Sequence, residues 1–176
     1  MKRVGLFSCL VWATLLIGAQ SDYYFPTGME VISEAGNKRM RLIGGQVAIF
    51  DTLSPVYSST DGKAQVACKT SNAIGGILGM YRDINNLYLG SLDYNYSYLK
   101  SWEKSSGTWY ALSYVSMPIS LGTYYYLQFA CTSGSQTLTC NSYNVYSSDI
   151  TLITGKPGFM TFTGECWYDN LSCWKP

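Results

Sequence analysis

Short apolar runs rich in Tyr, Val, Ile, Leu, Thr and Phe recur along the chain after residue 21, and Gly, Asn, Ser or Pro residues separate them. Short strands that alternate with turns every ~8–12 residues are typical of an all-β sandwich or barrel. No segment in this part of the chain keeps a helical period over three turns. The pattern therefore predicts one all-β domain, either a sandwich or a barrel. We expect strands at residues 28–33, 46–50, 64–70, 75–82, 87–94, 98–104, 108–115, 124–132, 137–145, 158–162 and 165–174.

Glycine positions add detail to this pattern. Turns are expected at residues 85–86, 105–107 and 155–158, because Asn, Ser, Gly and Pro gather there. The Gly-rich strand at residues 75–79 is expected to bend or to pass close to a neighbour, because a glycine inside a strand has no side chain to pack.

The first 21 residues differ from the rest. Two basic residues precede an apolar run at positions 4–17, and small residues follow, which is the order of a secretory signal. Ala19 and Ser21 fit the −3 and −1 positions of a cleavage site. The apolar run is shorter than the ~20 residues that span a bilayer. We therefore expect a signal peptide at residues 1–21, a secreted mature domain at residues 22–176, and no membrane span in that domain.

Composition excludes several kinds of chemistry. The 176 residues include no histidine, so a Ser-His-Asp or Cys-His nucleophile and an imidazole-ligated zinc site are ruled out. The 12 basic and 11 acidic residues form no basic stripe, which argues against a nucleic-acid partner. The 16 tyrosines stand out against this low charge.

Cysteines carry a second expectation. Cys9 leaves with the signal, and in an oxidising compartment the five others are expected to pair, with one left over. A turn at residues 134–137 would place Cys131 directly opposite Cys140, so we expect a disulfide between them. Cys166 and Cys173 lie ~23 Å apart in an extended strand and cannot bond each other. Cys68 is left to pair with one of those two, and which one stays open. No pair has the short spacing of a zinc knuckle, so no metal is expected.

Aromatic residues supply the candidate binding site. Tyr94, Tyr96, Tyr98 and Trp102 fall at period two, with Lys100 between them, and are expected on one face of an extended segment. Two further tyrosines share a face of the strand at residues 124–132, opposite its apolar residues. A row of such rings can stack on sugars or enter a protein interface. Alternatively, these residues are good strand formers that fill the core. The candidate carbohydrate-binding residues are Tyr94, Tyr96, Tyr98, Trp102, Tyr124 and Tyr126.

Three stretches together resemble a known superfamily. They are AQVACKTSNAIGGILGMYRDINNLYLGSLDY, YLKSWEKSSGTWYALSYV, and TYYYLQFACTSGSQTLTC followed by DITLITGKPGFMTFTGECWYDNLSCW. In this order they are similar to the concanavalin A-like lectin/glucanase superfamily, in particular to laminin-G-like jelly-roll domains. The resemblance covers residues from about 60 to 174. It implies an antiparallel two-sheet β-sandwich of the jelly-roll type, whose terminal strand lies beside the first strand, with Asp169 and Asn170 satisfying backbone groups. A calcium role for Asp169 lacks an acidic cluster.

The resemblance also bears on activity. Catalytic members of the superfamily use two carboxylates on one strand, commonly as Glu-x-Asp-x-x-Glu, and that string is absent. Convergence of Glu103, Asp93 and Asp83 stays open, although exposed charges at strand ends are more ordinary. We therefore expect a non-catalytic, lectin-like protein without a cofactor. The alternatives are a structural or adhesive surface protein that self-associates, and a small glycosidase. Sequons at Asn95 and Asn170 also stay open, and a glycan at Asn95 would obstruct the tyrosines beside it.

Overall fold

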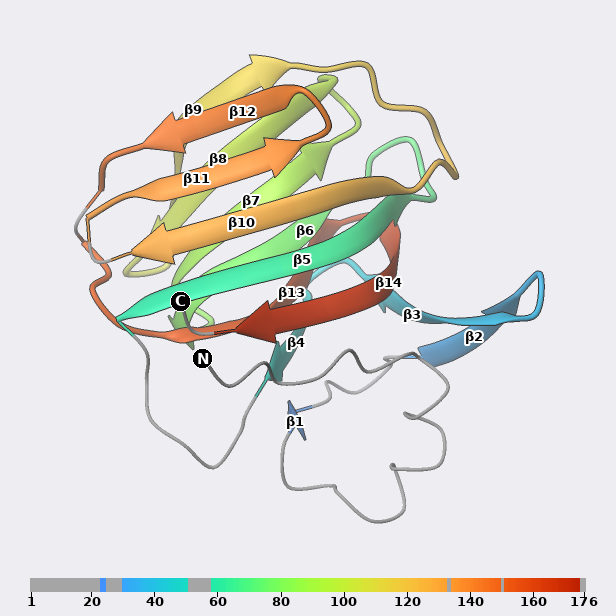
Figure 1. The fold of residues 1–176 in the computed structure, drawn as a ribbon, viewed down its shortest axis with the longest axis horizontal. Helices are drawn as coiled ribbons and strands as arrows, with labels where there is room; N and C mark the ends of the chain where they lie inside the picture. Colours follow the sequence, from blue (N-terminus) through green and yellow to red (C-terminus); the bar gives the residue numbers. More distant parts are fainter. Residues whose placement is uncertain (1–22, 25–29, 51–57, 133, 150, 175–176) are drawn as a thin grey trace.

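Two antiparallel sheets form the protein. The computed structural model describes residues 23–24, 30–50, 58–132, 134–149 and 151–174. Within these ranges every regular element is a strand, and two seven-stranded sheets stack face to face (Figure 1). The all-β antiparallel sandwich expected from the sequence is confirmed. The described residues include no helix that is long and apolar enough to cross a membrane.

Sheet A has the strand order β1-β4-β13-β6-β7-β8-β9. Its edges are β1 and β9. The strands are β1 (Tyr23–Tyr24), β4 (Gln46–Phe50), β13 (Lys156–Thr163), β6 (Ile74–Asp83), β7 (Asn86–Asp93), β8 (Tyr98–Ser105) and β9 (Thr108–Ser116).

Sheet B has the order β12-β11-β10-β5-β14-β3-β2, so the last strand of the chain lies between β5 and β3. In Figure 1 this sheet faces the viewer, and the β2–β3 hairpin projects to one side. The strands are β12 (Tyr143–Ser147), β11 (Gln136–Cys140), β10 (Tyr125–Thr132), β5 (Ser59–Cys68), β14 (Glu165–Trp174), β3 (Asn37–Ile43) and β2 (Glu30–Glu34).

Most of the expected strands are present, and two details were wrong. The strand β3 was missed, although its alternation of charged and apolar residues is that of a half-buried strand. The strand expected at residues 137–145 is two strands, because the chain turns at Asn141, which has a φ of 53°. An Asn accepts this left-handed conformation more readily than most residues.

The turn expected at residues 155–158 is also wrong, because β13 begins at Lys156. The glycines there have another role. A Cβ on Gly155 would overlap the backbone of Met80, and one on Gly158 would lie 2.5 Å from the carbonyl oxygen of Ala48. Glycine therefore permits close strand packing at these positions. The turn expected at residues 105–107 is confirmed, and Gly107 has a φ of 85°.

The main core lies between the sheets and holds the largest buried side chains, among them Tyr88, Phe129, Phe159 and Tyr168. A second apolar cluster lies on the outer face of sheet A. Leu87 and Leu89 belong to it, because they alternate with Tyr88 and point away from the main core. Aromatic side chains pack against this second cluster and cover it. Its members are Val47, Ile49, Leu78, Leu87, Leu89 and Met160, and the packing residues are Tyr81, Trp102, Trp109 and Phe162.

Candidate functional site

The six candidate binding residues do not form one site. Tyr98 and Trp102 alternate with the buried Leu99 and so point outward from sheet A. Tyr124 and Tyr126 alternate with the buried Leu127 and point outward from sheet B. Because the sheets stack face to face, the two pairs lie on opposite outer faces of the sandwich. The expectation that Tyr124 and Tyr126 share a face, opposite the apolar residues of the same strand, is confirmed.

The segment before Tyr98 departs from the expected period. Ser97 has a φ of 54°, so residues 94–97 form a turn rather than an extended strand. Tyr94 packs against the main core, whereas Tyr96 is 64% exposed. The expectation that Tyr94, Tyr96, Tyr98 and Trp102 line one extended face is therefore wrong, and the alternation holds only from Tyr98 onward.

Trp102 contributes to the second apolar cluster. Its ring centroid lies 6.2 Å from that of Trp109 and 6.4 Å from that of Phe162. Its Nε1 donates a hydrogen bond of 3.0 Å to the Ser91 hydroxyl, and Lys100 Nζ lies 3.6 Å from the ring centroid. These contacts give Trp102 a packing role on sheet A.

The polar groups on this face are poorly solvated. Asp93 is 1% exposed and accepts a 3.3 Å hydrogen bond from the backbone N–H of Tyr96. Burial raises the pKa of Asp93 and lowers the pKa of Lys100. The face thus disfavours charge.

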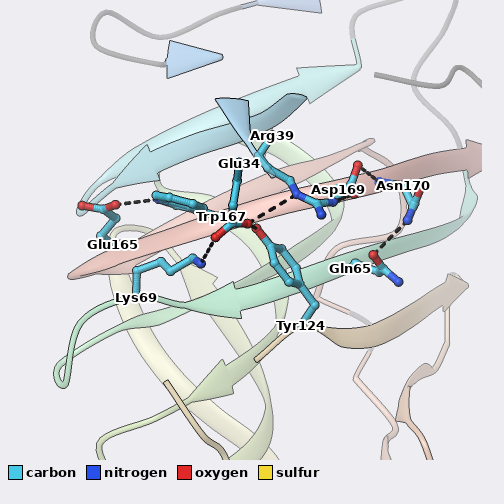
Figure 2. Close-up of polar contacts among 9 residues, drawn as sticks. All are labelled: Glu34, Arg39, Gln65, Lys69, Tyr124, Glu165, Trp167, Asp169 and Asn170. Atoms are coloured by element: carbon cyan, nitrogen blue, oxygen red, sulfur yellow. Dashed lines mark hydrogen bonds and ion pairs between the residues drawn. The ribbon is translucent and has the colours of Figure 1, made fainter. Parts of the chain in front are cut away.

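The outer face of sheet B is different, because it concentrates ionic and aromatic groups (Figure 2). The charged cluster combines side chains from β2, β3 and β14 with residues at one end of β5 and at the start of β10. We define the charged cluster as Glu34, Arg39, Lys69, Tyr124, Glu165, Trp167 and Asp169. Only Tyr124 was among the expected site residues.

Glu34 is the acceptor at one end of the charged cluster. It accepts a 2.7 Å hydrogen bond from the Tyr124 hydroxyl and a 3.0 Å hydrogen bond from Lys69 Nζ. Arg39 Nε lies 3.6 Å from its carboxylate. The hydrogen bond from Tyr124, together with that from Lys69, lowers the pKa of Glu34. Burial, and then the bond to Glu34, raises the pKa of Tyr124. Glu34 is therefore held as a carboxylate and Tyr124 as a phenol.

Two aromatic rings flank a lysine at the centre of the cluster. Lys69 Nζ lies 3.8 Å from the ring centroid of Trp167 and 5.1 Å from that of Tyr124. The residue between these rings is small: Ala67 pairs in register with Trp167, and the adjacent Val66 pairs with Tyr125, the residue after Tyr124. The short side chain of Ala67 leaves the space above the sheet to the lysine.

Arg39 and Asp169 form the other end. They make an ion pair in which the side chains are only 12% and 11% exposed, and Arg39 also lies 4.5 Å from the Tyr124 ring centroid. Asp169 was expected to satisfy backbone groups. It does accept a 2.8 Å hydrogen bond from the N–H of Asn170, and its pairing with Arg39 is an additional role. Asn170 in turn donates a 2.9 Å bond to Gln65 (Figure 2).

Glu165 joins Trp167 to the edge of the sheet. It accepts a 2.6 Å hydrogen bond from Trp167 Nε1 and a 3.0 Å hydrogen bond from Arg41, which also donates 2.7 Å to Glu30. The bond from Arg41 lowers the pKa of Glu165. Every charge here has a partner of opposite sign, whereas the described residues hold no group of three or more acids or cysteines placed to bind a metal ion.

The three acids considered for catalysis do not converge. Glu103 pairs in register with Tyr88, and Asp93 pairs with Tyr98 five residues further along β7. An odd offset places the two acids on opposite faces of the sheet, ~16 Å apart along the strand. Asp83 accepts hydrogen bonds from Asn85 and Asn86 in its own turn. These three residues therefore do not form a two-carboxylate site.

The disulfide expected between Cys131 and Cys140 is also wrong. Cys131 pairs in register with Gln136, and Cys140 pairs with Leu127. The reason is a shorter loop: β10 ends at Thr132 and β11 begins at Gln136, so the turn lies nearer to Cys131 than expected. Both thiols are free and buried, and burial raises the pKa of Cys140 to about 11.

Comparison with known proteins identifies the fold. No family model matches the chain, and no curated protein matches it. Among solved structures, it is similar to the carbohydrate binding module CBM66 from Bacillus subtilis, with 14% identity, a TM-score of 0.72, and coverage of 88% of this chain and 96% of that one. A Bacillus subtilis protein of unknown function with a galectin-like fold aligns with 9% identity, a TM-score of 0.62, and coverage of 88% and 89%. The GH43 protein BlXynB from Bacillus licheniformis aligns with 14% identity and a TM-score of 0.66, but 88% of this chain spans only 37% of it. At these identities the likeness shows the fold alone, an antiparallel β-sandwich.

The sequence contained a usable signal for part of the charged cluster. Arg39 and Arg41 alternate with Met40 and Leu42, which marks a strand with a charged outer face. Nothing local predicts that Glu34, Lys69 and Trp167 meet there, because three different strand pairings bring them together.

Proposed function

We propose that the chain is a secreted, non-catalytic, lectin-like protein that binds carbohydrate through the charged cluster of sheet B. The observation that carries the proposal is the arrangement of Tyr124 and Trp167 beside paired carboxylates and cations on an outer sheet face. Secretion is part of the proposal and is supported by the order of residues in 1–21. Membership of the concanavalin A-like superfamily is likewise proposed, on the residues quoted for the resemblance and on the sandwich fold.

The chemistry of a sugar suits this arrangement. Sugar hydroxyls donate to carboxylates such as Glu34 and Asp169 and accept from a guanidinium such as Arg39. The apolar face of a sugar ring stacks on an aromatic ring such as Trp167. Because the charges are already paired and oriented, little side-chain ordering is needed on binding. Tyr126 pairs in register with Gln65 on the same face and is exposed, so it extends the aromatic surface.

The similar structures support the ligand class. The name of the Bacillus subtilis module describes it as carbohydrate binding, and the alignment covers 96% of that module. For this chain, carbohydrate binding stands as a proposal that the following experiment tests.

A glycan array combined with retention on insoluble polysaccharides tests the proposal. We expect Trp167→Ala to weaken retention roughly fivefold or more, because ring stacking contributes on the order of 1 kcal/mol. Tyr124→Phe keeps the ring and removes only the hydroxyl bond to Glu34, so its loss should be smaller. Tyr146→Ala is the matched control, since Tyr146 is 62% exposed on β12, at the edge of the same sheet. Absence of binding to every glycan, or equal retention by the Trp167 variant, would contradict the proposal.

A structural or adhesive role remains the second candidate, favoured by the edge of sheet A. The strand β9 has nine residues and no charge, and its Tyr110 and Tyr114 are exposed. Sheet edges that avoid pairing with other chains usually carry charges or proline. If this role applies, the chain self-associates in a size measurement, and Ala111→Lys on β9 returns it to the monomer. A monomer at all concentrations would exclude assembly through β9.

A further inference from the structure

Two buried cysteines face each other across the centre of sheet B. Cys68 on β5 pairs in register with Cys166 on β14. Both are fully buried and belong to the main core between the sheets. On the neighbouring strand Cys131 stands opposite Gln136, Cys140 opposite Leu127 and Cys173 opposite Gly62, so none of these pairings joins two cysteines.

The backbone hydrogen bonds identify the type of pair. Lys69 N–H donates to the carbonyl oxygen of Glu165 at 2.8 Å. Lys69 follows Cys68 and Glu165 precedes Cys166, so the hydrogen bond runs beside the two cysteines and they form a non-hydrogen-bonded pair. Such pairs have Cα atoms ~4.5 Å apart, the closer of the two antiparallel spacings. This separation lies within the range that disulfides span, ~4.4–6.8 Å.

The facing sheet leaves room for the sulfur atoms. A Cβ on Gly75 of β6 would lie 2.6 Å from Cys166 Sγ, so glycine keeps this space open. The Cys68 thiol, in contact with that of Cys166, raises the pKa of Cys166, as does burial. Two neutral thiols that touch in an apolar core gain little from each other, because a thiol is only a weak donor and acceptor.

We propose that Cys68 and Cys166 form a cross-strand disulfide when the chain folds in an oxidising compartment. The two thiols lose two protons and two electrons as the sulfur–sulfur bond forms. The acceptor is a disulfide oxidant, either glutathione disulfide or the disulfide of an oxidoreductase, and it is released as two thiols. Since both sulfurs are buried in the folded chain, the exchange takes place before sheet A closes over β5 and β14.

The bond has a consequence for the outer face. Lys69 follows Cys68, and Trp167 follows Cys166, so the disulfide fixes the register of the two strands directly beneath the charged cluster. The bond does not depend on carbohydrate binding: it stands or falls on the register of β5 and β14, whatever the ligand.

Peptide mapping tests the proposal directly. The full-length chain is produced through a secretory route and, separately, refolded in a mixture of reduced and oxidised glutathione. Each sample is unfolded in denaturant that contains N-ethylmaleimide, which alkylates the free thiols, and is then digested without reduction. We expect a linked peptide pair containing Cys68 and Cys166, with Cys131 and Cys140 alkylated. Alkylation of Cys68 and Cys166, or a bond from either one to another cysteine such as Cys173, would overturn the proposal.

Thermal unfolding provides the second measurement. The bond closes a loop of ~100 residues, so reduction should lower the Tm of the wild type by roughly 10 °C. The double variant Cys68→Ala/Cys166→Ala should have the same Tm with and without reductant, which separates the bond from any packing defect. Cys140→Ser is the control and should keep the difference. An equal Tm of oxidised and reduced wild type would contradict the proposal, and glycan retention measured on the same samples reports separately on the proposed function.

Discussion

The outer faces of sheets A and B are built from the same strand alternation but carry opposite chemistry. On sheet A six outward positions form an apolar cluster, and aromatic residues such as Trp102 and Phe162 cover it. On sheet B the outward positions carry five ion pairs among Glu30, Glu34, Arg39, Arg41, Lys69, Glu165 and Asp169. The first face resembles a small second core, whereas the second is a network of paired charges. The same sandwich therefore has one apolar and one ionic outer face.

The pKa values of three carboxyl groups shift in different directions on the two faces. On sheet B, hydrogen bonds from Tyr124 and Arg41 lower the pKa values of Glu34 and Glu165. On sheet A, burial raises the pKa of Asp93. Hydrogen bonds to the carboxylate dominate at Glu34 and Glu165, whereas desolvation dominates at Asp93 and also at Asp61 on β5 of sheet B.

The largest expected effect tests whether the outer face of sheet A is a true core. We expect Leu89→Ala to lower the free energy of unfolding by about 2–5 kcal/mol, because Leu89 is buried in the second apolar cluster. Leu92→Ala on the same strand probes the main core and should cost a similar amount. Thr139→Ala, on the outer face of sheet B, should change the free energy of unfolding by less than ~0.5 kcal/mol. Denaturant titration measures all three, and a Leu89 effect as small as that of Thr139 would contradict the comparison.

The next effect tests the half-buried ion pair on sheet B. Arg39→Ala leaves Asp169 without its cation, at a cost of about 2–3 kcal/mol, somewhat below that of a fully buried pair. Arg41→Ala is the matched control, since its pairs are more exposed and each contributes at most ~1 kcal/mol. Denaturant titration measures the free energy of unfolding of both variants. Equal losses would mean that Arg39 contributes no more than an exposed surface charge.

The sequence predicted the fold class and most strands, because alternation and turn residues are local signals. Gln46–Phe50 and Glu165–Trp174 were placed with their observed ends. The sequence was less successful in predicting which candidate binding residues share a face. The tyrosines at 94, 96 and 98 were placed on one face because they alternate in the sequence. The left-handed backbone of Ser97 interrupts this alternation, and no glycine in the sequence indicates a turn there.

The charged cluster could not be derived in the same way. Glu34 and Lys69 lie 35 positions apart, and Trp167 is almost 100 positions further on. Only the placement of β14 between β5 and β3 brings these residues together. The disulfide expectation failed for a related reason, since the turn lies two residues nearer to Cys131 than expected and moves the partner of Cys131 from residue 140 to Gln136.

A smaller effect concerns pH and has opposite signs on the two faces. The pKa of Glu34 is lowered in the fold, so its contribution to stability is present above the unfolded value and is lost as the pH falls through the folded one. The pKa of Asp93 is raised, so its contribution grows as the pH falls. Glu34→Gln should therefore destabilise near pH 7, and its difference from the wild type should shrink as the pH falls below the usual glutamate pKa of ~4.3.

Asp93→Asn is the counterpart of Glu34→Gln on sheet A. It removes a poorly solvated carboxylate while keeping an acceptor for the N–H of Tyr96, so it should stabilise near neutral pH and lose that advantage in acid. Unfolding curves at several pH values measure both variants. The comparison fails if both have the same pH dependence.

The smallest expected effect on stability gives the sharpest test of which face binds. Each face holds a lysine against aromatic rings: Lys100 Nζ lies 3.6 Å from the Trp102 ring centroid, and Lys69 Nζ lies 3.8 Å from that of Trp167. Lys69 also has Glu34 as an ionic partner, whereas burial lowers the pKa of Lys100.

Replacement of each lysine by Met keeps a side chain that packs on the rings and removes the charge. For Lys100→Met, the lost cation–π attraction and the relieved desolvation offset each other, so the free energy of unfolding should change by less than ~1 kcal/mol and glycan retention should stay unchanged. For Lys69→Met, Glu34 loses a hydrogen bond and retention should fall. If Lys100→Met abolishes retention while Lys69→Met does not, the tyrosines of sheet A bind the glycan and the assignment of the two faces is reversed.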